Sequence, residues 1–151
     1  MSQIIINQFS MARNWTIELA EDLTEEIANM QPEGFNNTIK WQLGHIIGAA
    51  EYFMRILPGN QAELPVLYQE LFSPGTRPSE WKSEPPHLSE ITIELKKQLE
   101  RINKISPEQL KETLKEPVHH FNTVADSASF CVLHESVHVG QIQIMKQFFK
   151  V

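Results

Sequence analysis

The chain has 151 residues, a formal net charge of −6 and a pI of about 5.5. This length predicts a single domain, residues 1–151, with room for a substantial hydrophobic core. The acidic balance and the absence of any run of basic residues argue against nucleic-acid binding, because phosphate recognition requires clustered Lys and Arg.

The single cysteine, Cys131, excludes an intrachain disulfide and is typical of a reducing compartment. Residues 1–8 carry no basic segment and too short an apolar run for a signal peptide. No stretch is long and apolar enough to span a membrane. We therefore expect a cytoplasmic protein that does not bind membranes.

Helical periodicity appears first over residues 3–22, and a short helical turn over 24–30 follows, stopped near Pro32 and Gly34. A second long helix is expected from a cap at Asn37 or Thr38 to Leu57. The inward stripes of the two long helices are Ile5, Phe9, Ala12, Thr16, Leu19 and Leu23, and Trp41, His45, Gly48, Tyr52 and Ile56.

Gly44 and Gly48 are poor helix formers, costing about 1 kcal/mol each relative to Ala. Because they lie on or beside the His45 face, they indicate a close approach by another backbone or by a ligand. Tight helix packing alone would also account for them.

Six prolines between residues 58 and 87 rule out a long helix or a central strand there. We expect only a short helix over residues 66–72. Such a long insert is often a lid or pocket wall, and Tyr68, Phe72 and Trp81 would supply its aromatic surface. Alternatively, these rings attach the insert to the rest of the domain.

A third long helix is expected over residues 89–103, followed by a capping box at 106–109 that predicts a short helix to Leu114. Residues 117–122 would form a connection, and a box at 123–126 would start a last helix that continues to residue 151. No stretch alternates as a strand does. The sequence therefore predicts an all-α, four-helix bundle with a proline-rich insert after its second helix.

His134 and His138 stand four residues apart in the last helix, so their side chains share one face. That face is otherwise the apolar stripe Val124, Ala128, Cys131, Ile142 and Met145. A buried imidazole requires a partner. A shared metal ion is one candidate, and hydrogen bonds to a neighbouring helix are the other.

The same letters spell H-E-x-x-H, in which Glu135 would be the general base of a zinc hydrolase. We do not favour this interpretation. Residues 139–151 contain no further His, Asp or Glu, and Glu135 points about 100° away from His134 around the helix.

A third ligand must therefore lie upstream. His45 occupies the inner stripe of a long helix, whereas His87, His119 and His120 fall in loops or near helix starts. We pair His45 with the two histidines of the last helix.

The segments Trp41-Gln42-Leu43-Gly44-His45-Ile46 and His134-Glu135-Ser136-Val137-His138-Val139-Gly140-Gln141 resemble the DinB-like superfamily. That resemblance implies a four-helix bundle in which His45, His134 and His138 bind one metal ion. It also implies a homodimer. Gln141 would orient a ligand or form a hydrogen bond between helices.

The resemblance further implies a metal-dependent enzyme, a transferase, isomerase or hydrolase, that activates water or a low-molecular-weight thiol towards a small-molecule substrate. Imidazole ligands suit Zn, Ni or Fe. A non-catalytic binding bundle and a bundle whose histidines only form hydrogen bonds are the alternatives. Glu51 and Asp126 are the acids we would place near the histidines. We expect metal affinity to fall near pH 6–7, where an unperturbed imidazole protonates.

Overall fold

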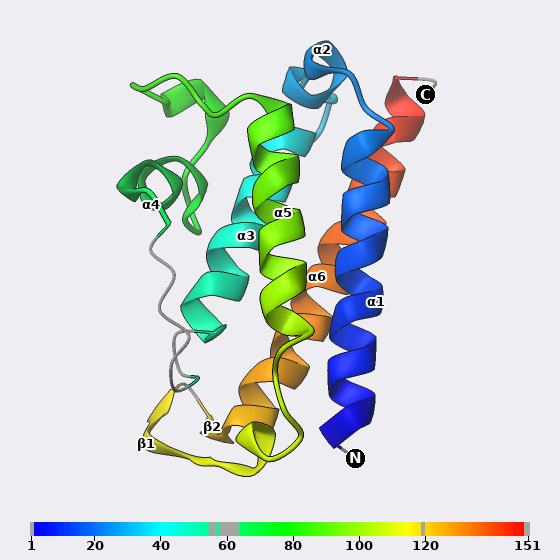
Figure 1. Ribbon diagram of the computed structural model, residues 1–151. Coiled ribbons are helices and arrows are strands. Elements are labelled where there is room, and N and C mark those ends of the chain that lie inside the picture. The colour runs from blue at the N-terminus through cyan, green and yellow to red at the C-terminus, as the bar shows by residue number, and fades with distance from the viewer. Residues whose placement is uncertain (1, 55–56, 58–63, 119, 150–151) are drawn as a thin grey trace.

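The computed structural model describes residues 2–54, 57, 64–118 and 120–149. Within these residues four long helices run side by side along one axis (Figure 1). They are α1 (Ser2–Glu21), α3 (Ile39–Met54), α5 (Leu88–Ile102) and α6 (Val124–Phe148). The predicted helix bundle is confirmed, with α3 and α6 antiparallel to each other (Figure 1).

Short elements connect the long helices. Residues 24–30 contain α2 (Glu25–Asn29), and the insert contains α4 (Val66–Phe72) and a 3₁₀ turn, η1 (Pro78–Glu80), as Figure 1 shows. Thr38 accepts from the Trp41 amide at the start of α3, and Thr123 caps α6 within a capping box, both as predicted. The predicted C-terminal turn of α3 at residues 55–56 lies outside the described residues.

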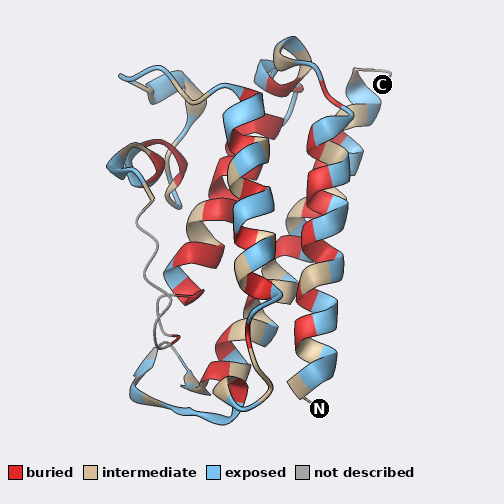
Figure 2. Cartoon of the chain, viewed as in Figure 1, coloured by how far each residue is buried: buried red, intermediate tan, exposed pale blue. Residues whose placement is uncertain are grey.

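The long helices bury the faces that they turn towards one another (Figure 2). Phe9, Ala12 and Thr16 on α1 are buried as the periodicity predicted. The predicted position of Tyr52 is wrong, because its side chain is 52% exposed. Its neighbour Phe53 enters the core instead, where it packs with other aromatic rings.

Within the described residues the structure adds one small hairpin to the predicted helix bundle, which remains mostly helical. β1 (Thr113–Val118) pairs antiparallel with β2 (Phe121–Thr123) at the lower end of the bundle (Figure 1). The capping box at Ser106 and Gln109 does form, but only a 3₁₀ turn, η2 (Gln109–Lys111), follows it. The predicted helix to Leu114 and the predicted connection at 117–122 are therefore both wrong. Cross-strand pairing stabilises extended backbone here even though the sequence shows no alternation.

A buried chain of polar side chains joins all four long helices. Arg13 of α1 donates through Nε to Glu135 Oε1 of α6 at 2.7 Å and through a terminal nitrogen to Gln98 Oε1 of α5 at 2.5 Å. Gln98 in turn donates to Glu51 of α3 at 3.1 Å, and Arg101 of α5 donates to both Glu51 oxygens at 2.7 and 2.9 Å. The two guanidinium groups balance the two carboxylates, so the core holds charge without a net excess.

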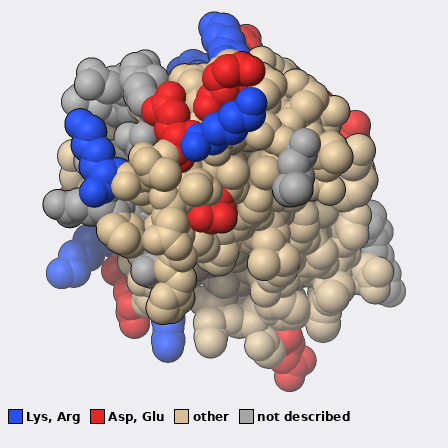
Figure 3. All heavy atoms as spheres, turned by 90° about the horizontal axis from the view of Figure 1, so that it is seen from below, with Lys and Arg blue, Asp and Glu red and all other residues tan. Residues whose placement is uncertain are grey.

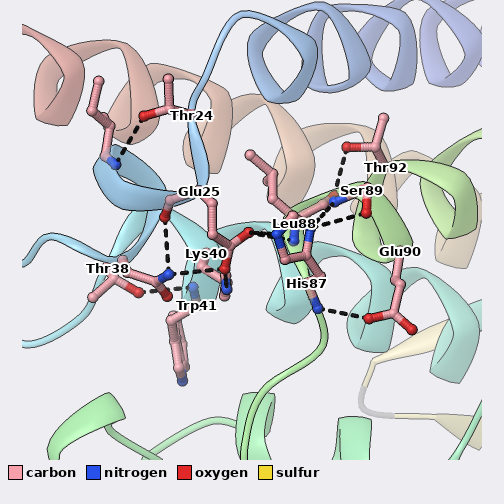
Figure 4. Close-up of polar contacts among 12 residues, drawn as sticks. Thr24, Glu25, Thr38, Lys40, Trp41, His87, Leu88, Ser89, Glu90 and Thr92 are labelled. Atoms are coloured by element: carbon pink, nitrogen blue, oxygen red, sulfur yellow. Dashed lines mark hydrogen bonds and ion pairs between the residues drawn. The ribbon is translucent and has the colours of Figure 1, made fainter.

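A buried lysine joins α2, α3 and α5 at the end of the bundle where α3 and α5 begin. The Lys40 ammonium, only 2% exposed, forms an ion pair with Glu25. The second Glu25 oxygen accepts from the Leu88 amide at 2.7 Å, at the first turn of α5, and His87 caps that helix (Figure 4). Desolvation is the largest single effect on the pKa of Glu25, and it raises that pKa. The hydrogen bonds from Lys40 and from the Leu88 amide act in the opposite direction, and the net result is a lowered pKa.

Cys131 is 4% exposed and lies in the part of the core nearest the hairpin. Burial raises the pKa of its thiol far above the usual range, and the neighbouring Glu135 carboxylate adds to that shift. None of the helices in the described part of the chain has the length and apolarity needed to cross a bilayer.

We expect Glu135→Ala to lower the free energy of unfolding by about 3–5 kcal/mol, because Arg13 would remain buried without its counter-charge. Urea denaturation followed by circular dichroism measures the change. Lys96→Ala is the control, since it removes an exposed ion pair with Glu21 worth about 0–1 kcal/mol. Equal losses in the two variants would show that the buried pair has no special weight.

Candidate metal centre

Three histidines from α3 and α6 meet at one point in the bundle. His45 Nε2 lies 3.2 Å from His134 Nε2, and His134 Nε2 lies 3.2 Å from His138 Nε2. The four-residue spacing on α6 brings His134 and His138 onto one face, and antiparallel packing brings α3 against that face. His87 caps α5 and His120 lies in the hairpin turn, so neither joins the cluster. His119 lies outside the described residues.

The ring of His45 is held from behind. Its Nδ1 lies 2.7 Å from the Phe72 carbonyl oxygen, which can only accept, so Nδ1 carries the proton. The Trp41 ring stacks on the imidazole, with centroids 4.7 Å apart and planes at 11°. The unprotonated Nε2 therefore faces the cluster in a fixed orientation.

His138 is oriented in the same way by a residue that sequence reasoning missed. Its Nδ1 donates to the Gln42 amide oxygen, and Gln42 Nε2 donates to Asn37 Oδ1 at 3.0 Å. Gln42 is 3% exposed and lies three residues before His45, on the same face of α3. The sequence does carry a signal for this role, because an amide side chain three residues before His45 lies on the histidine face of the same helix. Gln141, the predicted neighbour, lies near enough to His138 to oppose part of the lowering of the pKa of its imidazole.

These bonds leave the cluster with converging lone pairs. With Nδ1 protonated on His45 and His138, both of their Nε2 atoms are acceptors, and one proton on His134 could satisfy only one of them. A cation at the common point would satisfy all three nitrogens at once. The ligand atoms lie within 4.8 Å of one another, so the donor set fits one divalent ion. The outer hydrogen bonds on Nδ1 are those that metal-binding histidines usually make.

Comparison with known proteins identifies the family to which the chain belongs. The model of the DinB superfamily matches residues 8–142. The chain belongs to the DinB superfamily. A crystal structure of a conserved protein from Enterococcus faecalis aligns with a TM-score of 0.63 and 16% identity, over 98% of this chain and 96% of that one. At this identity the likeness shows that the two chains share a fold, and nothing further. A search of curated proteins found no match.

The cluster of this DinB protein is held neutral by its surroundings. Desolvation and the neighbouring His45 lower the pKa of His134 to about 4. Desolvation, then His134 and His45, lower the pKa of His138 to about 3, against the smaller effect of Gln141. Desolvation also lowers the pKa of His45, and the bond to the Phe72 carbonyl opposes that shift. The imidazoles of His134 and His138 are therefore available as neutral ligands well below pH 7, and the lowered pKa of His45 favours its neutral form too.

Glu135 does not face the DinB cluster. Both of its oxygens are taken by Arg13, at 2.7 and 3.1 Å, and one also accepts from the Thr16 hydroxyl at 2.7 Å. The general-base role that H-E-x-x-H would give it is therefore excluded by position. The expected acids near the cluster are also elsewhere, since Glu51 binds Arg101 and Asp126 caps α6.

The insert forms part of the site by fixing His45. The Phe72 ring packs directly on Gly44, where an added Cβ would lie 2.5 Å from ring carbons. Phe72 is 1% exposed and contacts the rings of Tyr68 and Trp81 at 5.4 and 5.5 Å. Of the two expectations for these aromatics, attachment of the insert to the bundle is the one that the structure supports.

We expect His45→Ala, His134→Ala and His138→Ala each to weaken binding of one Zn²⁺ by at least about tenfold, because each removes one ligand. Calorimetric titration of untagged protein measures the affinity. The matched controls His87→Ala and His120→Ala should change it little. Unchanged affinity in His45→Ala would show that the third ligand is wrong.

The lowered pKa values revise the expected pH dependence. Since the imidazoles of His134 and His138 protonate only near pH 4 and pH 3, protons should compete poorly with metal at pH 6. We expect Zn²⁺ affinity, measured by competition with a chelator calibrated at each pH, to stay nearly constant from pH 7.5 to 6 and to fall below pH 5. A midpoint near pH 6.5 would contradict the lowered pKa values.

We expect Gly44→Ala to destabilise the fold and to weaken metal binding, because the new methyl group would displace Phe72 and with it the acceptor for His45. A loss of roughly 1–3 kcal/mol in thermal unfolding is typical of such overpacking. Gly48→Ala is the matched control in the same helix. It meets open space and should gain up to about 1 kcal/mol from helix propensity.

Proposed function

We propose that this DinB protein is a metal-dependent enzyme that activates water or a low-molecular-weight thiol at the cluster of His45, His134 and His138. The observation that carries the proposal is the convergence of three Nε2 atoms on one point. In His45 and His138 a hydrogen bond from Nδ1 holds the ring so that Nε2 faces that point as a ligand. Three protein ligands are typical of a catalytic metal site, because a further position stays open. Zn, Ni or Fe would suit the imidazole donors.

A divalent ion held by the three imidazoles would lower the pKa of a thiol or water bound to it. The thiol proton would pass to solvent, the sulfur would form a bond to an electrophilic carbon, and the leaving group would depart with its electron pair. The chain fixes the positions of the ligands. Trp41 covers one side of His45, and the half-buried His134 and His138 form the opposite side of the site.

The properties of the protein's own thiol, Cys131, favour a nucleophile that comes from outside the protein. Cys131 is buried, its thiolate is strongly disfavoured, and it is not among the three residues of the cluster. A thiol reaction at this site would therefore use a small-molecule thiol.

We also propose that the protein does not bind nucleic acid and that it acts in the cytoplasm. The net charge of −6 supports the first point. On the lower face of the molecule, the Lys and Arg residues that the structure describes lie interspersed with Asp and Glu and do not gather into a basic patch (Figure 3).

The test uses untagged protein purified without nickel, stripped of metal and reloaded with Zn²⁺, Ni²⁺ or Fe²⁺. We expect at least one metal to speed the reaction of 2-mercaptoethanol with 1-chloro-2,4-dinitrobenzene about tenfold or more over metal-free protein, equivalent to about 1.4 kcal/mol of barrier. His134→Ala should abolish that gain. Metal binding without acceleration over a panel of thiols and electrophiles would favour the non-catalytic binding bundle instead.

A further inference from the structure

Two glycines on the His45 side of α3 have opposite surroundings. Gly44 is fully covered by the Phe72 ring, which occupies the place of a side chain. Gly48, one turn further on, is half-buried, and a Cβ added there meets no atom within 4 Å. One glycine is therefore needed for packing, and the other leaves room that no described side chain fills.

The register between α3 and α6 locates this room relative to the histidines. Gln42 contacts His138, and His45 contacts His134, so α3 descends as α6 ascends. One further turn places Gly48 of α3 at the level of Phe130, which is one turn before His134. The contact between Phe130 and Phe53, which lies five residues after Gly48, shows that the Phe130 ring faces α3, with centroids 5.0 Å apart.

The wall at this level is aromatic. The Phe130 ring lies 6.0 Å from His134 and 5.3 Å from the Phe121 ring of β2. Phe121 also contacts Phe53, so the three phenyl rings brace one another. Phe130 and Phe121 are half-buried, and Phe130 presents apolar surface beside His134. On the other side of His45, Trp41 and the Phe72 carbonyl already occupy the space.

We propose that the space over Gly48, walled by Phe130, is the subsite for an apolar and preferably aromatic group of the molecule that binds at the three-histidine site. This inference rests on the proposed metal-binding function, because the metal would hold the polar end of the same molecule. Aromatic rings prefer edge and offset contacts with other rings at centroid distances that this cluster already adopts. A ring over Gly48 would add a fourth member to it.

The experiment compares two probes that differ only in the group beside the metal-binding end, benzohydroxamate and acetohydroxamate. The protein is loaded with Co²⁺, whose visible spectrum reports both metal binding and hydroxamate binding. Affinities are divided by those of the two probes for aqueous Co²⁺. We expect wild-type protein to prefer the phenyl probe by at least about tenfold.

Gly48→Leu should abolish that preference by filling the space, while acetohydroxamate binding and the Co²⁺ spectrum stay unchanged. Leu is also a better helix former than Gly, so a loss of fold is not expected. Gly140→Leu is the matched control, because Gly140 of α6 is also half-buried with open space around its Cβ but lines a groove with Trp15 of α1. Phe130→Ala should reduce the preference without changing acetohydroxamate binding.

The outcomes separate the two proposals. If Co²⁺ does not bind to wild-type protein, the metal site fails, and the subsite falls with it. If Co²⁺ binds but wild-type protein shows no preference for the phenyl probe, or if Gly48→Leu keeps that preference, the subsite is overturned and the metal site stands.

Discussion

The ion pair between Arg13 and Glu135 is the interaction on which the site depends. Glu135 follows His134 directly, so the rotation of α6 that turns Glu135 towards α1 also turns His134 and His138 towards α3. A charged pair with almost no exposure tolerates little rotation, because any shift would leave a buried charge without its partner. Gln98 and Glu51 extend the constraint to α5 and α3. The polar core therefore fixes the angle at which the histidines meet.

The insert and the start of α3 complete the site from outside the bundle core. The Phe72 carbonyl oxygen and the Gln42 amide oxygen each accept a hydrogen bond from Nδ1 of one imidazole. These two acceptors select the tautomer that leaves Nε2 free, which is the state that a metal ligand needs. Gly44 is part of the same arrangement, because only a residue without a side chain lets the Phe72 ring pack against α3 beside His45. The irregular insert thus fixes the tautomer of a histidine that lies on a long, regular helix.

Sequence reasoning found the features that depend on local spacing. The periodicity of α1, the caps at Thr38 and Thr123, and the shared face of His134 and His138 follow from helix geometry. The hairpin escaped it because β1 contains charged residues and a proline, and its extended backbone depends on pairing with β2.

Partners that are distant in the sequence were also missed. The residues that orient His45 and His138 lie 27 and 96 positions away along the chain, and one of them acts through a backbone carbonyl that carries no signal in the sequence. The lowered pKa values of the cluster have the same origin, because burial and neighbouring rings cause them. The aromatic wall beside His134 combines α3, β2 and α6, so it too exists only in the folded chain.

The burial of Cys131 has a practical consequence for solution work on this molecule. The chain has one cysteine, and its thiol is buried and hard to ionise. Native protein should therefore not react with maleimides and other thiol-directed labels. A cysteine introduced at an exposed position such as Val66 or Leu133 would then carry a single fluorophore or spin label without removal of the natural one. Distances from such a label to a paramagnetic ion among the histidines could be measured on an otherwise unaltered core.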